Sequence, residues 1–152
     1  MADPYVAGLA LLARRELSES QVRRRLARRG FAPDEVDGAI ERLRRDRALD
    51  DTRTAAAIAR TQVTIRGRGR LRVRREIEAA GIPTSIAERA VDDVFQDIDS
   101  DVLLEAAITR RLRGAPTIDD DATFRRLYRF LVTQGFDSDR VLQALRARRS
   151  PR

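Results

Sequence analysis

The sequence predicts an all-α fold of three tandem three-helix repeats that form an elongated, curved body. The 152 residues are rich in Ala, Leu and Arg and include only 8 Gly and 5 Pro, a composition that favours helix. No stretch alternates apolar and polar residues between turn signals, so we expect no strands. One residue pattern also occurs three times with a period near fifty, which is typical of a helical repeat array.

The repeated pattern is centred on Gly30, Gly81 and Gly135. Apolar residues lie four and eight positions before each glycine, and another follows it directly. Ala and a further apolar residue lie nine and ten positions after it. Gly can adopt the left-handed conformation that ends a helix, so we expect each glycine to close a helix, and Gly81 to have a positive φ. The predicted repeats cover residues 1–48, 49–98 and 99–152.

In the first repeat we expect helices over 5–15, 18–30 and 33–47. Ser18, followed three residues later by Gln21, predicts a capping box at the start of the second helix. Pro33 stands where the first turn of a helix tolerates it.

The second repeat begins at Leu49, and Asp50 or Asp51 is expected to cap the helix that follows. Ser85 and Glu88 predict a second capping box, at the start of the third helix of this repeat.

The third repeat begins near Ser100. A loop through 119–121 leads to the helix that ends at Gly135, and the last helix is expected over 138–148.

The stretch 66–82 combines a flexible loop with a basic helix. Seven arginines lie between positions 60 and 75 with no acidic residue among them. Because such arginines repel one another, we interpret the stretch as a cationic surface for phosphate or an acidic protein. The alternative is the solvated face of an amphipathic helix. Arg70, Arg72 and Arg75 flank the apolar positions and are expected to point to solvent.

Charge is sorted by helix along the chain. The middle helix of every predicted repeat is net basic, whereas the third helices of the first two repeats are net acidic. An acidic third helix would be repelled by phosphate, which argues against a helix-turn-helix DNA reader except in the third repeat. The middle-helix arginines are therefore the expected contacts to nucleic acid or to a protein partner. They are Arg24, Arg25, Arg28, Arg66, Arg68, Arg70, Arg72, Arg74, Arg75, Arg125, Arg126 and Arg129.

The composition excludes several chemistries. The chain has no Cys and no His, so it lacks a disulfide, a thiol nucleophile, an imidazole base and the usual zinc ligands. The carboxylates at 119–121 could bind a divalent cation, but helix capping explains them more simply. We expect no catalytic residue, no cofactor and no metal, and hence not an enzyme. The apolar run 6–13 is too short to cross a bilayer, so we expect a soluble, cytoplasmic protein. We also expect it to be a monomer.

Three segments carry a resemblance to a known family. Leu49-Asp50-Asp51-x-Arg53-x-Ala55 is similar to the motif L-D-D-x-R-[FY]-A. The segment from Gly69 to Ile82 is similar to G-x-x-R-I-R-x-E-L-x-x-K-G-I, and Arg129-Phe130-Leu131-x-x-x-Gly135-Phe136 to R-[FY]-L-x-x-[RK]-G-[FY]. With these motifs in this order, the chain resembles the RecX family of bacterial recombinase regulators.

The resemblance implies a regulatory function. Such a protein would bind RecA and the RecA–DNA filament and inhibit recombinase, ATPase and co-protease activity, thereby modulating DNA recombination, DNA repair and the SOS response. Single- or double-stranded DNA would be bound weakly. The net charge of +7 also indicates an anionic partner. The alternative is a sequence-independent DNA-binding protein without a recombinase partner.

Overall fold

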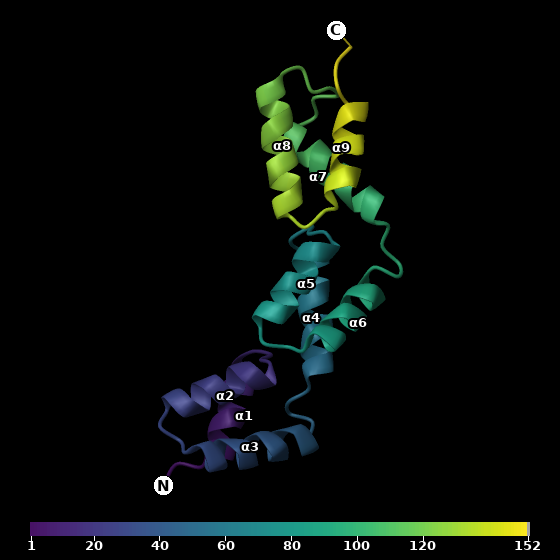
Figure 1. Ribbon diagram of the computed structural model, residues 1–152. Helices are drawn as coiled ribbons and strands as arrows, with labels where there is room; N and C mark the ends of the chain where they lie inside the picture. The colour runs from purple at the N-terminus through teal and green to yellow at the C-terminus, as the bar shows by residue number, and fades with distance from the viewer. Residues whose placement is uncertain (152) are drawn as a thin grey trace. The chain divides into compact units, whose positions relative to one another are not determined.

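The computed structural model describes residues 1–151 and is helical through most of them (Figure 1). The helices are α1 (Pro4–Arg14), α2 (Glu19–Arg28), α3 (Pro33–Arg45), α4 (Asp51–Thr64), α5 (Arg70–Ala79), α6 (Thr84–Val94), α7 (Ser100–Leu112), α8 (Asp121–Thr133) and α9 (Ser138–Ala147). Within 1–151 there is no strand, only an isolated bridge between Ile118 and Arg149. The predicted all-α fold is confirmed. No helix in this range has both the length and the apolar character needed to cross a membrane.

The chain divides into two compact units. Unit 1 consists of Met1–Ile58 and Glu76–Ala90, and unit 2 of Ala59–Arg75 and Val91–Arg152. Each unit has its own buried apolar core. The boundaries of the three sequence repeats stay a prediction.

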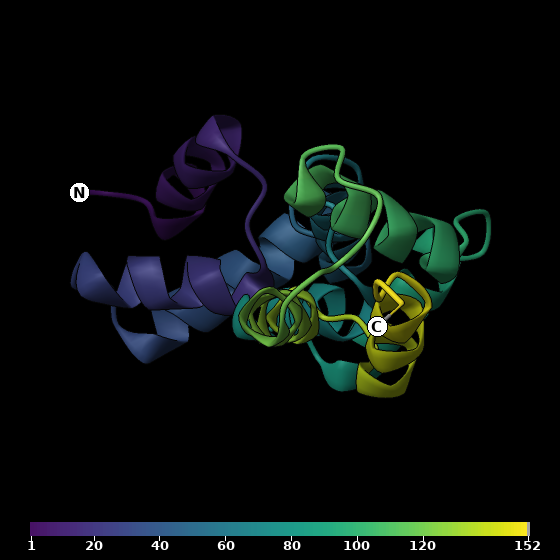
Figure 2. The same cartoon turned by 90° about the horizontal axis from the view of Figure 1, so that it is seen from above.

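In unit 1, helices α1, α2 and α3 pack on one another (Figures 1 and 2). Local signals begin each helix: Asp3 caps α1, and Ser18 with Gln21 forms the predicted capping box of α2. Pro33 begins α3, where its missing N–H is harmless. The core residues between these helices are Leu11, Leu17, Val22, Leu26, Val36, Ala39, Ile40, Leu43 and Leu49.

In unit 2, helices α7, α8 and α9 pack on one another (Figure 1). Each begins at an aspartate whose side chain accepts a backbone N–H of the first turn: Asp99, Asp120 and Asp137. Asp120 therefore caps a helix, as the sequence suggested for the 119–121 carboxylates. The core of this unit contains Leu104, Ala107, Ile108, Ile118, Leu127, Leu131, Phe136, Val141 and Leu145.

The three repeat glycines end α2, α5 and α8 in the left-handed region. The φ angles are +94° at Gly30, +83° at Gly81 and +99° at Gly135, so the expected positive φ is confirmed. A β-carbon would be strained at all three positions. Their surroundings differ, because only Gly30 has open space where a β-carbon would lie.

Within unit 1, the end of α5 meets the start of α2. The buried Ser18 hydroxyl donates to the backbone carbonyl of Ala80. A β-carbon at Gly81 would lie 2.5 Å from the side chain of Ser20. The glycine thus ends one helix and also leaves room for the first turn of another.

Unit 2 contains a similar junction. The backbone N–H groups of Gly69 and Leu71 donate to the carbonyls of Gln134 and Gly135, at 2.9 and 3.1 Å. The start of α5 therefore satisfies carbonyls at the end of α8, which no intrahelical donor can reach.

Two local predictions are wrong. Helix α6 begins at Thr84, because the Pro83 carbonyl already accepts the N–H of Ala87 at 3.0 Å. Ser85 lies inside that helix and cannot be its capping residue. Helix α3 ends at Arg45, two residues before the predicted end, and Arg47 has a φ of +59°.

Candidate functional site

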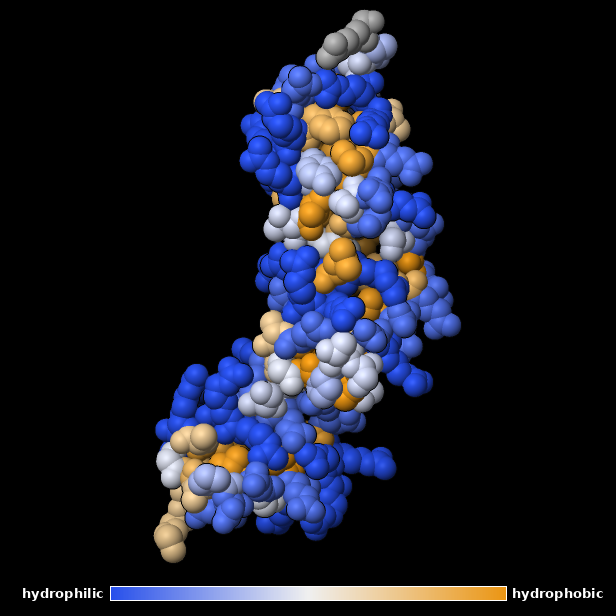
Figure 3. Space-filling view, in the orientation of Figure 1, coloured by the Kyte–Doolittle hydropathy of each residue, from blue (hydrophilic) through white to orange (hydrophobic). Residues whose placement is uncertain are grey.

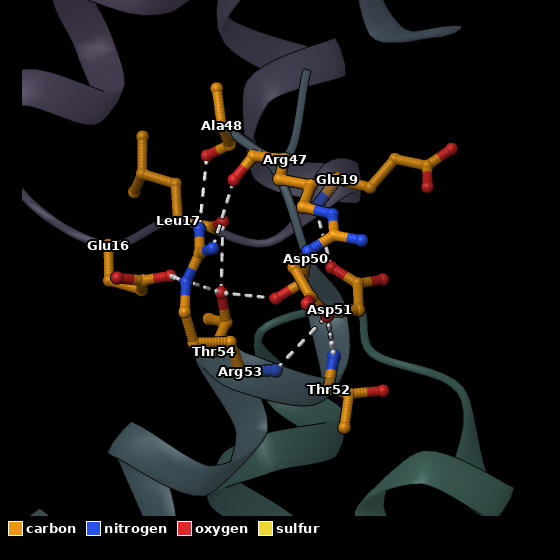
Figure 4. A network of polar contacts seen from close by, with 10 residues as sticks. All are labelled: Glu16, Leu17, Glu19, Arg47, Ala48, Asp50, Asp51, Thr52, Arg53 and Thr54. Carbon is orange, nitrogen blue, oxygen red and sulfur yellow. Dashed lines mark hydrogen bonds and ion pairs between the residues drawn. The ribbon is translucent and has the colours of Figure 1, made fainter. Parts of the chain in front are cut away.

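The acidic motif, Leu49-Asp50-Asp51-x-Arg53-x-Ala55, follows α3 and joins two connections of unit 1 (Figure 4). The Arg53 guanidinium lies within unit 1 between the Glu16 carboxylate, at 2.8 Å, and two backbone carbonyls. It donates to the Arg47 carbonyl at 3.0 Å and to the Ala48 carbonyl at 3.2 Å. The planar guanidinium group of arginine has several N–H donors in fixed directions, so it can bind three acceptors at once. The ammonium group of a lysine would do this less well. The motif therefore holds the α3–α4 connection to the α1–α2 connection.

The two aspartates of the motif have separate roles (Figure 4). Asp50 caps α4, because its carboxylate accepts the N–H groups of Thr52 and Arg53 at 3.0 and 3.2 Å. Asp51 instead accepts the N–H of Glu19, at 2.9 Å, in the first turn of α2. Burial raises the pKa of Asp51, although the hydrogen bond from Glu19 opposes that shift. Both carboxylates are thus used to hold helix ends.

The predicted arginine contacts are mostly on the surface. Eight of them are exposed: Arg24, Arg28, Arg66, Arg70, Arg75, Arg125, Arg126 and Arg129. The other four are half-buried: Arg25, Arg68, Arg72 and Arg74. On the face seen in Figure 3, hydrophilic side chains cover most of the surface around small apolar patches.

Arg70 is exposed, as expected, but it also has partners within unit 2, whereas the expectation that Arg72 points to solvent is wrong. Arg70 forms an ion pair with Asp92, and its guanidinium carbon lies 5.6 Å from the centre of the Phe95 ring. Arg72 is half-buried and donates to the Thr133 carbonyl at 3.0 Å. Both side chains thus contact other residues of unit 2, the unit that contains the first part of α5, and the sequence did not identify these partners.

One arginine position is shared by all three middle helices. Arg24, Arg75 and Arg129 each lie six residues before the glycine that ends their helix. All three are exposed, and no described carboxylate forms an ion pair with any of them. Unpaired cations at an equivalent position of each helix are available to bind an anionic partner.

A second basic site was missed by the sequence analysis. In unit 2, a pocket of about 470 Å³ is lined by Arg66 together with Arg110, Arg111 and Arg113 from the end of α7. Only Arg66 was among the predicted contacts. The run Arg110-Arg111-x-Arg113 was the available signal, but nothing in the sequence placed it beside Arg66.

Comparisons with known proteins agree with the described fold. Family models for the first and second three-helix domains of RecX match residues 5–43 and 50–91. A crystal structure of RecX from Lactobacillus salivarius superposes with a TM-score of 0.76 over 95% of each chain, at 20% sequence identity. A second crystal structure, of a regulatory protein RecX, gives a TM-score of 0.73 and covers 95% of this chain and 70% of that one.

Curated relatives carry the same name. The chain is 35% identical to regulatory protein RecX of Halorhodospira halophila, over 93% of this chain and 85% of that protein. It is 32% identical to regulatory protein RecX of Chromohalobacter salexigens, over 95% and 91% of the two chains. The chain therefore belongs to the RecX family of regulatory proteins.

Proposed function

We propose that this protein binds RecA on its DNA filament and inhibits the recombinase, ATPase and co-protease activities of RecA. Through this inhibition it modulates recombination, DNA repair and the SOS response. It acts in the cytoplasm as a monomer and catalyses no reaction of its own. Membership of the RecX family supports the regulatory role.

The repeated arginine at the middle helices carries the proposal. A filament presents many phosphates and protein subunits, so a ligand with a cation at the same position of several helices can make the same kind of contact more than once. Arg24, Arg75 and Arg129 supply such cations, exposed and outside ion pairs with described residues. Arg70 and Arg72 are less suited to this role, because their side chains are engaged within unit 2.

A charge-reversal experiment tests the proposed surface. The variant with Arg24, Arg75 and Arg129 all changed to Glu is compared with one in which Arg15, Arg89 and Arg146 are changed to Glu. The control residues are exposed, lie outside the middle helices and carry the same charge change. Circular dichroism first establishes that both variants are folded. Inhibition of the ATPase of RecA on single-stranded DNA is then measured at about 0.15 M salt, where charges beyond about 8 Å are largely screened.

The middle-helix variant should need at least about tenfold more protein for half-inhibition, since three attractions become repulsions. The control should stay within about twofold of the parent. Equal loss in both variants would show that only net charge matters. Absence of inhibition by the parent protein would overturn the proposed function itself.

The alternative, a DNA-binding protein without a recombinase partner, predicts a different result. In that case RecA–DNA filaments and bare single-stranded DNA should retain equal amounts of this protein at matched salt. Under the proposal, the filaments retain more.

A further inference from the structure

The pocket in unit 2 has an unusual concentration of positive charge. Four of its lining residues are Arg66, Arg110, Arg111 and Arg113, and no lining residue is acidic. None of the four guanidinium groups forms an ion pair with a described carboxylate. Elsewhere in the same unit, Arg140 and Arg148 have the acidic partners Asp101 and Glu105. Four unneutralised cations around one cavity repel one another, so the pocket favours an anionic occupant.

The shape of the donors indicates which anion. Guanidinium groups present planar pairs of N–H donors that match phosphate oxygens, and they remain charged at any physiological pH. The volume of about 470 Å³ lies in the range of about 300–1,000 Å³ that holds small-molecule ligands. The pocket can therefore hold a phosphate together with the group attached to it.

Two of the lining side chains, Arg111 and Phe130, are stacked on one another. The guanidinium carbon of Arg111 lies 3.8 Å from the centre of the Phe130 ring, so the cation stacks on the ring face. Such aromatic and guanidinium planes are the surfaces on which unpaired nucleic-acid bases stack. Gln134 also lines the pocket, and a glutamine side chain carries both a donor and an acceptor that suit a base edge.

From these features, we propose that the pocket binds one nucleotide of a single-stranded nucleic acid. Arg66, Arg110 and Arg113 hold the phosphate, and the base lies against the Arg111–Phe130 stack. A single strand is required, because bases inside a duplex are stacked on one another and cannot enter a pocket. The inference rests on the proposed function in one respect, because it takes the single strand to be the DNA of the RecA filament. The test below distinguishes failure of the nucleotide site from failure of the proposed function.

The test measures direct binding without any recombinase. Fluorescence anisotropy with a labelled oligo-dT compares the parent, the Arg110→Glu/Arg113→Glu variant and the charge-matched Arg15→Glu/Arg146→Glu control at about 0.15 M salt. The pocket variant should bind at least about tenfold more weakly, and its slope of log affinity against log salt should fall by about two. The control should change by less than about twofold.

A second variant tests the base stack. Arg111→Lys keeps the charge but removes the planar cation on Phe130, so oligo-dT affinity should fall several-fold. Poly-glutamate with the same charge as the oligo-dT should displace the oligo-dT from the protein only weakly. Equal losses in the pocket and control variants, an unchanged Arg111→Lys affinity, or equal competition by poly-glutamate would each overturn the nucleotide site. The RecA ATPase assay on the same proteins reports separately on the proposed function.

Discussion

The backbone N–H of Gly69 donates to the carbonyl oxygen of Gln134 at 2.9 Å, so α5 begins at the carbonyl end of α8. A β-carbon at Gly69 would lie 2.6 Å from the Gly135 carbonyl oxygen, and one at Gly135 would overlap the backbone of Arg72. Both glycines thus permit a close approach of two backbones. The partial charges of the two helix ends are also opposite, which adds to the attraction.

Because of this close approach, Gly30 and Gly135 should differ in how much stability is lost when each is replaced by alanine. Gly30→Ala should destabilise by about 1 kcal/mol, the cost of a left-handed non-glycine residue, because a β-carbon there has open space. Gly135→Ala should cost at least about twice as much, because the backbone of Arg72 must also move. Urea unfolding followed by circular dichroism measures both. Equal losses would mean that the close approach contributes nothing.

The clash at Gly81 should be relieved by a second substitution. Gly81→Ala brings a β-carbon within 2.5 Å of the Ser20 β-carbon and hydroxyl oxygen. In a Ser20→Gly background those atoms are gone, so the same change should cost about 1 kcal/mol less. A double-mutant cycle of unfolding free energies measures the coupling. Additive costs would contradict this contact.

Ser18 should contribute more stability than an ordinary helix cap. Its buried hydroxyl accepts the Gln21 N–H at 3.1 Å and donates to the Ala80 carbonyl. Ser18→Ala removes a cap and leaves a buried carbonyl without that donor, for a total of about 2–3 kcal/mol. Asp3→Ala, at the exposed cap of α1, should cost about 1 kcal/mol. Comparable unfolding free energies for the two variants would show that the bond to Ala80 adds nothing.

Arg53 should be irreplaceable by lysine. Its side chain has one carboxylate and two carbonyl acceptors, so Arg53→Lys should lose nearly as much stability as Arg53→Ala, about 1 kcal/mol. Oligo-dT binding, measured well below the unfolding midpoint, should be unchanged in both. Weakened binding in a fully folded Arg53→Lys protein would mean that the acidic motif also contacts the ligand.

Asp51 should make stability depend on pH. Burial raises its pKa above the ordinary value of 3.8, so the folded state binds this proton more tightly than the unfolded state. The ionised carboxylate therefore destabilises the protein at neutral pH, and the penalty is relieved as pH falls through the raised pKa. Asp51→Asn should be more stable than the parent at pH 7, because the amide oxygen can still accept the Glu19 N–H. The difference in urea midpoint should shrink towards about pH 4. A difference that is constant with pH would contradict this assignment.

The sequence by itself determined the class of fold and the places where helices end. Helical periodicity, the Ser18 capping box and the three glycines depend on the conformational preferences of neighbouring residues, which act before any tertiary contact forms. The positive φ at Gly81 is a local property of this kind. Local signals were less reliable at Ser85, because the carbonyl of Pro83 can begin a helix without a side-chain cap.

Tertiary structure decided which arginine side chains remain available to bind an anionic partner. Arg70, Arg72 and Arg75 were all expected to point to solvent, yet Asp92 and the Thr133 carbonyl engage the first two. Arg66 and Arg110 line one pocket although 44 positions separate them in the sequence. Such pairings depend on how helices far apart in the chain pack within a unit. Backbone propensity and periodicity describe only residues within a few turns of one another.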